Sequence, residues 1–114
     1  MQEFIDSLKR GEFRLPVCTS CEAKVWPPSY YCPVCLSKTS LQIINTHGTL
    51  LYFTISYLKG MEGCYGLVEM AGIKLIGSFD TLELKDGLQV KMVMCGVKPE
   101  GTPYYIFEPI RGGH

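Results

Sequence analysis

The sequence lacks an excess of charge of either sign, and this absence argues against several classes of partner. Eleven Lys and Arg residues balance eleven Asp and Glu residues, and the first forty residues carry five basic and four acidic side chains, so neither part of the chain is basic. A protein that binds nucleic acid unaided presents a basic patch to the phosphates. The formal net charge is zero, and it would fall below zero if four of the cysteines, described below, bound a divalent metal as thiolates. We therefore expect nucleic acid to be an unlikely partner.

Long apolar runs are also missing. No stretch approaches the roughly 18 residues needed to span a bilayer, and the opening MQEFIDSLKR has acidic residues and no apolar segment of the kind found in a signal peptide. We expect a cytoplasmic protein with no membrane partner. In a reducing compartment, paired cysteines indicate a metal site before they indicate a disulfide.

Residues typical of an active site are scarce. The sequence has no glycine-rich phosphate loop and no Ser-centred nucleophile motif, and His47 is the one histidine away from the C-terminal residue. Cys64 and Cys95 lie in expected strands with no general base beside them in sequence. We interpret them as buried small apolar residues rather than nucleophiles. We expect no catalytic residue and no enzyme activity in this chain alone.

What the sequence does have is two Cys-x-x-Cys pairs in CTSCEAKVWPPSYYCPVC, formed by Cys18 with Cys21 and Cys32 with Cys35. Each pair presents two sulfurs on one side of a tight loop, and the crossing between the pairs lets the loops face each other. Tetrahedral Zn²⁺ takes four such thiolates at about 2.3 Å. The spacing predicts a closed, structural zinc site with no open position for water or substrate. Iron bound by the same four ligands, as in a rubredoxin-like site, is the alternative.

The remaining pattern predicts a short helix followed by strands. Residues 2–10 carry an apolar stripe that must dock either on this chain or on a partner. From residue 40 we expect a long first strand bent at Gly48, a hairpin turning at Ala71-Gly72, a single helical turn in DTLELKDG, and two last strands in LQVKMVMCGV and YYIFEP. Five strands in this order predict an OB-fold, with an SH3-like barrel or a small sandwich as rivals.

The fold class expected from these features is mainly β, with a short N-terminal helix, a rubredoxin-like zinc ribbon and a C-terminal five-stranded OB-fold barrel. We divide the chain into the helix at residues 1–12, the ribbon at 13–40, the OB-fold at 41–110 and a flexible tail at 111–114. The Pro-Pro step in the crossing favours an extended connection between the two cysteine pairs.

Together the short helix, the Cys-x-x-Cys pair, WPPSYYCPVC, HGTLLYFT and the closing YYIFEP resemble the acyl-CoA-associated zinc-ribbon/OB-fold family, formerly catalogued as a domain of unknown function. The resemblance covers nearly the whole chain. It implies a non-catalytic partner of thiolase-superfamily enzymes, similar to the small archaeal subunit that bridges acetoacetyl-CoA thiolase and hydroxymethylglutaryl-CoA synthase. In that role the protein would shuttle an acyl-CoA of the mevalonate pathway through a shared CoA/pantetheine site.

Two alternatives remain open. Relatives of this family also complete hydratases and aldolases that act on other acyl-CoA thioesters, and the sequence does not separate this role from the first. A module binding single-stranded nucleic acid through aromatic residues of an OB-fold is the other alternative.

The sequence departs from the family's pattern at two kinds of position. A glycine usually follows each Cys-x-x-Cys pair, where this chain has Glu22 and Leu36. Glycine eases a turn of positive φ, so these substitutions are expected to lower the stability of the loops without removing a ligand. Ser29 replaces a basic residue that often follows the Pro-Pro step, which removes one potential contact with a CoA phosphate or a partner carboxylate.

Candidate contacts with CoA and with a partner follow from residue chemistry alone. The nucleotide of CoA requires cations, which gives four candidates, each with the competing interpretation of a solvated surface charge: Lys24, Lys59, Lys74 and Arg111. A partner interface requires apolar and aromatic anchors. The candidates for that role are the helix stripe and two aromatic residues of the crossing, namely Phe4, Ile5, Leu8, Trp26 and Tyr30.

Overall fold

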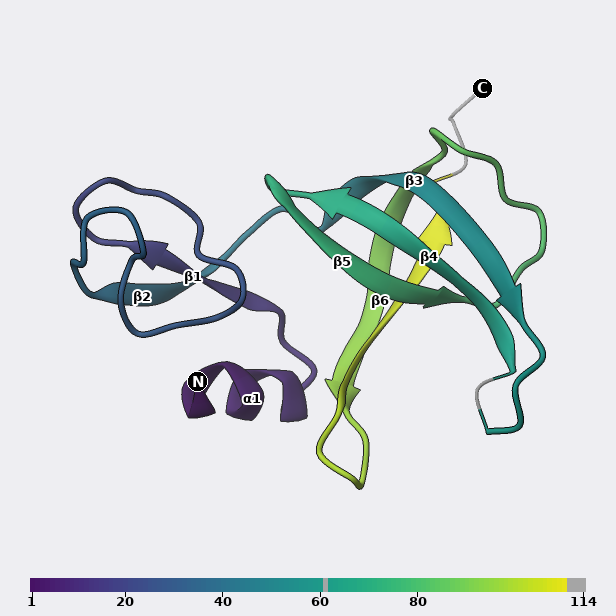
Figure 1. Ribbon diagram of the computed structural model, residues 1–114, viewed down its shortest axis with the longest axis horizontal. Helices are drawn as coiled ribbons and strands as arrows, with labels where there is room; N and C mark the ends of the chain where they lie inside the picture. The colour runs from purple at the N-terminus through teal and green to yellow at the C-terminus, as the bar shows by residue number, and fades with distance from the viewer. Residues whose placement is uncertain (61, 111–114) are drawn as a thin grey trace. The chain divides into compact units, whose positions relative to one another are not determined.

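The computed structural model describes residues 1–60 and 62–110, and the chain divides into two compact units (Figure 1). The first unit holds Met1–Asn45 and Cys95–Pro103, and the second holds Thr46–Met94 and the chain from Tyr104 onward. The expected tail at 111–114 lies outside the described residues. Within the described part of the chain, no helix reaches the length and apolarity that a membrane crossing needs.

The expected helix is present as α1 (Gln2–Lys9), and its apolar stripe docks on this chain. Phe4 and Leu8 are buried. The ring of Phe4 packs edge-on against those of Phe13 and Trp26, with centroids 5.9 and 5.7 Å away. Gly11 ends the helix with a positive φ, and its N–H donates to the carbonyl oxygen of Leu8. This glycine has the role expected of it at the C-terminal end of a helix.

A two-stranded antiparallel sheet forms the base of the ribbon. It pairs β1 (Arg14–Cys18) with β2 (Thr39–Ile43), in a register running from Arg14 opposite Ile43 to Cys18 opposite Thr39. The segment at residues 41–57, which was expected to form one long strand bent at Gly48, is therefore two strands. The first part completes the ribbon, which extends past residue 40, and the barrel begins at His47. The two arms of the ribbon pair because the cysteine loops connect them.

The second unit is built on a closed five-stranded barrel in the order β3-β4-β5-β7-β6. Its strands are β3 (His47–Ser56), β4 (Gly63–Met70), β5 (Ile73–Phe79), β6 (Gln89–Val97) and β7 (Pro103–Pro109). β3 pairs with both β4 and β6, and β5 pairs in parallel with β7. This strand order is that of an OB-fold, so the fold class expected from the sequence is confirmed.

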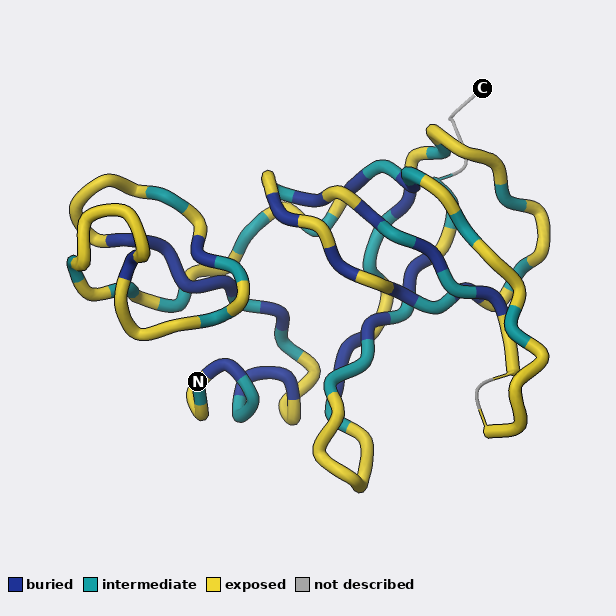
Figure 2. The backbone as a smooth tube through the Cα atoms, viewed as in Figure 1, coloured by how far each residue is buried: buried dark blue, intermediate teal, exposed yellow. Residues whose placement is uncertain are grey.

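Alternate residues of the barrel strands face a common core (Figure 2). β4 and β5 alternate buried and exposed positions almost without interruption, which is typical of strands with one face toward a core. The largest fully buried side chains in this unit are those of Leu50, Val68, Met70, Val90 and Phe107.

The bend expected at Gly48 of β3 is not found there. The irregularity of β3 lies between Leu50 and Tyr52 rather than at Gly48. Gly48 serves close packing instead, because a Cβ there would lie 2.5 Å from the carbonyl oxygen of Glu69 on β4.

The stretch DTLELKDG forms turns rather than a helical turn. The hydroxyl of Thr81 accepts the N–H of Glu83 at 3.1 Å, which offers the backbone a partner other than a helical carbonyl. Gly87 has a φ of 87° and directs the chain into β6, with its N–H donated to the carbonyl oxygen of Leu50. The hairpin at Ala71-Gly72 is confirmed, and both turn residues have positive φ.

Candidate metal centre

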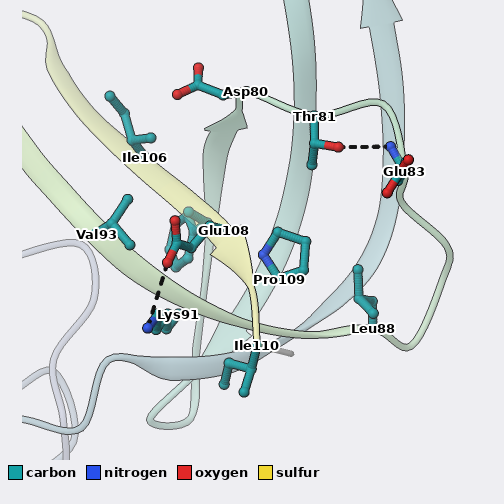
Figure 3. A pocket seen from close by; sticks show the side chains of 11 residues that line it. Asp80, Thr81, Glu83, Leu88, Lys91, Val93, Ile106, Glu108, Pro109 and Ile110 are labelled. Carbon is teal, nitrogen blue, oxygen red and sulfur yellow. Dashed lines mark hydrogen bonds and ion pairs between the residues drawn. The ribbon is translucent and has the colours of Figure 1, made fainter. Parts of the chain in front are cut away.

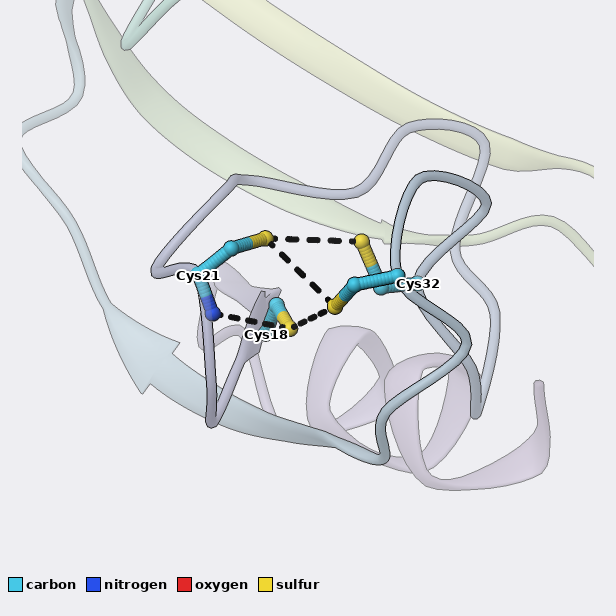
Figure 4. A group of neighbouring side chains, drawn as sticks. Cys18, Cys21 and Cys32 are labelled. Carbon is cyan, nitrogen blue, oxygen red and sulfur yellow. Dashed lines mark hydrogen bonds between the residues drawn. The ribbon is translucent and has the colours of Figure 1, made fainter.

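The four predicted metal ligands lie together in the ribbon (Figure 4). All four Sγ atoms are within 4.8 Å of one another. The Sγ–Sγ distances are 3.3 Å between Cys18 and Cys35 and 3.7 Å from Cys21 to both Cys32 and Cys35. A tetrahedron with metal–sulfur bonds of 2.3 Å has edges of about 3.8 Å, so the arrangement fits a zinc ion with four protein ligands.

Each cysteine pair is held by a turn whose backbone points at the sulfurs. The N–H groups of Ser20 and Cys21 donate to the sulfur of Cys18, and the N–H of Val34 donates to that of Cys32, all at 3.4 Å. These contacts stabilise negative charge on the ligands. Cys18 and Cys32 are buried, and together with Val25 they form a small apolar cluster. This cluster is too small to fold the loops unaided, so the bound ion would supply the missing stability.

Without a metal, the surroundings of Cys35 and Cys21 shift the pKa values of these two thiols in opposite directions. Hydrogen bonds from the backbone and side chain of Ser37 lower the pKa of Cys35 to about 6. The Ala23 amide lowers the pKa of Cys21, but hydrogen bonds with the other three cysteines and partial burial raise it to about 12. A divalent cation removes this conflict because it favours the thiolate form of every ligand.

Cys64 and Cys95, the two cysteines outside the metal centre, are shielded from solvent. Cys64 and Cys95 are buried, and burial raises the pKa of both thiols. His47 is exposed at the start of β3, opposite Lys91 of β6. A raised thiol pKa disfavours the reactive thiolate, in accord with the interpretation of both cysteines as small apolar residues.

The candidate CoA cations are distributed between the two units and the residues outside the described part of the chain. Lys24 belongs to the first unit, where it bridges to Val17. In the second unit, Lys59 follows β3 before β4 begins, whereas Lys74 pairs with Glu69 at the other end of β4. Eight residues of strand separate these two ends by roughly 25 Å. Arg111 lies outside the described residues, and CoA contact by any of the four stays a prediction.

The sequence did not reveal a hollow of about 780 Å³ in the barrel unit (Figure 3). Among its lining residues are Asp80, Glu83 and Glu108 against one cation, Lys91, whose ammonium lies 3.5 Å from Glu108. Three carboxylates and one ammonium give the lining a negative charge. That charge disfavours the phosphates of a nucleotide. The stretch DTLELKDG lines part of the hollow. It was expected to be a helical turn, so the sequence did not indicate a hollow there.

The candidate interface residues divide into buried and exposed ones. Phe4 and Leu8 are buried within the first unit, whereas Ile5 and Trp26 are half-buried. Tyr30 is exposed, and a hydrogen bond from its hydroxyl lowers the pKa of Glu3 on α1. Contact of any of these residues with a partner stays a prediction.

Comparison with known families agrees with this geometry. The model of the ChsH2 rubredoxin-like zinc ribbon domain matches residues 6–40, which include all four cysteines. The match supports a zinc ribbon over residues 6–40. No curated protein matches the chain.

Two solved structures share the fold over nearly the whole chain. A chain of the Ltp2-ChsH2(DUF35) aldolase is 19% identical, with a TM-score of 0.77, and the match covers 95% of this chain and 92% of that one. A DUF35-family protein of unknown function from Sulfolobus solfataricus is also 19% identical, with a TM-score of 0.64 and coverage of 94% and 84%. The resemblance to the zinc-ribbon/OB-fold family is confirmed, and the link to archaeal thiolase and synthase complexes stays a prediction.

The loops of the ChsH2-type ribbon carry the backbone conformation for which glycine is suited. Glu22 and Leu36 each have a φ of 62°, in the left-handed region that a side chain disfavours by about 1–2 kcal/mol. Their N–H groups donate to the carbonyl oxygens of Cys18 and Cys32, at 3.1 and 2.9 Å, which closes each loop. The positive φ expected after each cysteine pair is therefore present.

Replacing Glu22 with glycine is expected to stabilise the metal-bound ribbon by up to about 1 kcal/mol, because the strain is relieved while the greater freedom of the unfolded chain offsets part of the gain. The rate of zinc transfer to a coloured chelator measures this effect and should fall relative to wild type. Glu22→Ala, which keeps a Cβ at the strained position, is the matched control and should show no decrease. Faster release from the glycine variant would contradict the account of strain.

Proposed function

We propose that this chain is an accessory subunit of an acyl-CoA enzyme, held in shape by structural zinc and without catalytic residues of its own. The observation that carries the proposal is the likeness, over 95% of this chain, to a chain of the Ltp2-ChsH2(DUF35) aldolase. The likeness includes both ribbon and barrel, and the ribbon belongs to the ChsH2 type. It supports a role in an enzyme complex rather than in isolation.

The chemistry of the metal centre supports the non-catalytic part of the proposal. Four protein sulfurs fill the coordination sphere of a tetrahedral zinc ion, which leaves no position for a water or a substrate carbonyl. The ribbon would therefore use the ion to maintain its fold. When bound, the zinc supplies no more than four fixed bonds that hold the two loops together.

The charges of the chain support joint binding of CoA with a partner. The hollow in the barrel has an acidic lining, and within the barrel unit Lys59 and Lys74 lie near opposite ends of β4. An isolated chain with this distribution would bind the phosphates of CoA weakly. In the proposed complex, the partner enzyme supplies the contacts to the nucleotide, and this chain helps to shape the site for the pantetheine arm.

The proposal has two candidates for the reaction that the partner enzyme catalyses. The family resemblance seen in the sequence favours a bridge between acetoacetyl-CoA thiolase and hydroxymethylglutaryl-CoA synthase in the mevalonate pathway. The likeness to a chain of an aldolase supports the second candidate, in which the subunit completes an aldolase or a hydratase acting on another acyl-CoA. Single-stranded nucleic acid is disfavoured by the zero formal charge of the chain.

Affinity purification of the tagged chain from its native host, followed by mass spectrometry and metal analysis, tests the proposal. We expect an acyl-CoA enzyme of the thiolase superfamily in near-stoichiometric amount, together with one zinc per chain. A thiolase and a synthase together would support the bridging role, and an aldolase or hydratase would support the second candidate. Recovery of a zinc-loaded chain with no acyl-CoA enzyme attached would contradict both.

A further inference from the structure

The second cysteine loop exposes several apolar side chains to solvent. Tyr31, Val34 and Leu36, which we name the second-loop surface, are 54%, 80% and 75% exposed. They flank Cys32 and Cys35 along one continuous loop of the ribbon. Single exposed apolar residues are common, but three within six residues of one loop are a concentration of exposed apolar side chains, and such concentrations can mark interaction sites.

The backbone makes Leu36 the most informative of the three. Its φ of 62° places a branched apolar side chain in the left-handed region, where bulky residues are rare. The side chain gains little from the fold in return because three-quarters of it is exposed. The loop-closing hydrogen bond from its N–H to the carbonyl oxygen of Cys32 would form equally well with glycine. Leu36 therefore lowers the stability of the loop through backbone strain, and its exposed side chain gains little packing within this chain in return.

The first cysteine loop shows that this backbone does not require an apolar residue. Glu22 occupies the equivalent position with the same φ of 62°, and its charged side chain lies in solvent. The two loops thus share backbone geometry and differ in side-chain chemistry. The apolar character of the second-loop surface is a property of its side chains and not a consequence of metal binding.

We propose that the second-loop surface docks into an apolar recess of the partner enzyme, with Leu36 and Val34 as the inserted side chains. The inference rests on the proposed function and names the contact surface of that complex. Burial in a partner would compensate for both the strain and the exposure of Leu36. The surrounding segment, residues 29–37, has no Lys, Arg, Asp or Glu, so apart from the metal centre insertion would bury no charged side chain.

The charge of the metal centre selects this occupant over others. Four thiolates and one Zn²⁺ carry a net charge of about −2 next to the surface, and Lys38 offsets part of it. An anionic bilayer and a nucleic acid would be repelled. A second copy of the same loop would bring two such centres close together. A neutral or weakly basic recess on a different protein fits the surface best.

The experiment uses the acyl-CoA enzyme that copurifies with the wild-type chain and compares three zinc-loaded variants. Leu36→Gly is expected to retain zinc at least as well as wild type, because the strain is relieved, yet to bind the enzyme about tenfold to a hundredfold more weakly. Val34→Ser, at an unstrained position of the same surface, should also weaken binding. Glu22→Gly is the matched control, which relieves the same strain in the first loop and should bind as wild type.

The outcomes separate this inference from the proposed function. If wild type binds an acyl-CoA enzyme and both Leu36→Gly and Val34→Ser bind it equally well, the inference is overturned while the proposed function stands. If wild type binds no such enzyme, the proposed function fails and the inference fails with it. Leu36-dependent self-association, or Leu36-dependent binding to phosphatidylserine vesicles, in place of enzyme binding would overturn the choice of occupant.

Discussion

Replacing Cys32 with serine is expected to abolish zinc binding and to unfold the ribbon, while the barrel remains folded. Cys32 is fully buried, and its sulfur lies 3.7 Å from that of Cys21 on the opposite loop. Structural zinc contributes about 10–16 kcal/mol to the folding of small metal-dependent domains, and the cluster around the cysteines has few apolar side chains to replace it. The effect should exceed that of any substitution away from the four ligands.

Metal analysis and two-dimensional amide NMR together measure this outcome. The variant should contain less than a tenth of an equivalent of zinc, and the amide signals of residues 1–45 should collapse toward random-coil positions. Signals from β4 and β5 should stay dispersed, because the barrel has its own buried residues. Cys64→Ala is the matched control, since Cys64 is buried in β4 away from the four ligands, and it should keep one zinc. A dispersed ribbon spectrum in Cys32→Ser would contradict a structural role for the metal.

Replacing Phe107 with alanine is expected to destabilise the barrel by about 3–5 kcal/mol without loss of zinc. Phe107 is 1% exposed and stacks against Phe79 with ring centroids 6.0 Å apart. Truncation removes these contacts and leaves a cavity among the buried residues of the barrel. Urea unfolding followed by circular dichroism measures the loss, and metal analysis of the same samples checks that the ribbon is intact.

The glycine opposite this ring provides a control that tests the packing itself. A Cβ at Gly77 on β5 would lie 2.5 Å from Cε2 of Phe107. Gly77→Ala alone should therefore cost about 1–3 kcal/mol through overpacking. In the Phe107→Ala background the added methyl group enters space that the ring has left. The double variant should be less destabilised than the sum of the single ones, and strict additivity would show that the two positions do not meet in the core.

The metal ligands and the β4–β5 hairpin of the barrel could be predicted because each depends on the spacing of a few residues that are close together in the sequence. Two Cys-x-x-Cys pairs predict a four-sulfur site through the fixed geometry of the ligands, whatever surrounds them. Ala71-Gly72 between two alternating segments predicts a hairpin, and the structure has one there with both residues at positive φ. In each case a few neighbouring residues determine the conformation.

The errors lie where tertiary pairing decides the outcome. The segment from Leu41 to Tyr57 has strand character throughout, but its first part pairs with β1 and its second with β4, and no local signal marks the change of partner. The acidic sequence after β5 fits a helical turn by pattern, yet the Thr81 hydroxyl takes up the N–H of Glu83 instead.

Surface features were the least predictable part of the candidate site. Lys59 and Lys74 are equally suitable cations in the sequence, and only the strand pairing places them at opposite ends of β4. Phe4 and Leu8 carry the pattern of an interface, whereas the fold buries both of them. The exposure of Leu36, by contrast, becomes informative only when its backbone φ is known.

The measurement that tests the central claim most directly is acyl-CoA turnover by the purified zinc-loaded chain, by the copurified enzyme, and by the two together. The account predicts no turnover by the chain alone and a kcat/KM for the mixture about tenfold or more above that of the enzyme alone, because the subunit completes the site for the pantetheine arm. Turnover by the chain alone, or full activity of an enzyme that does not bind the chain, would contradict the account.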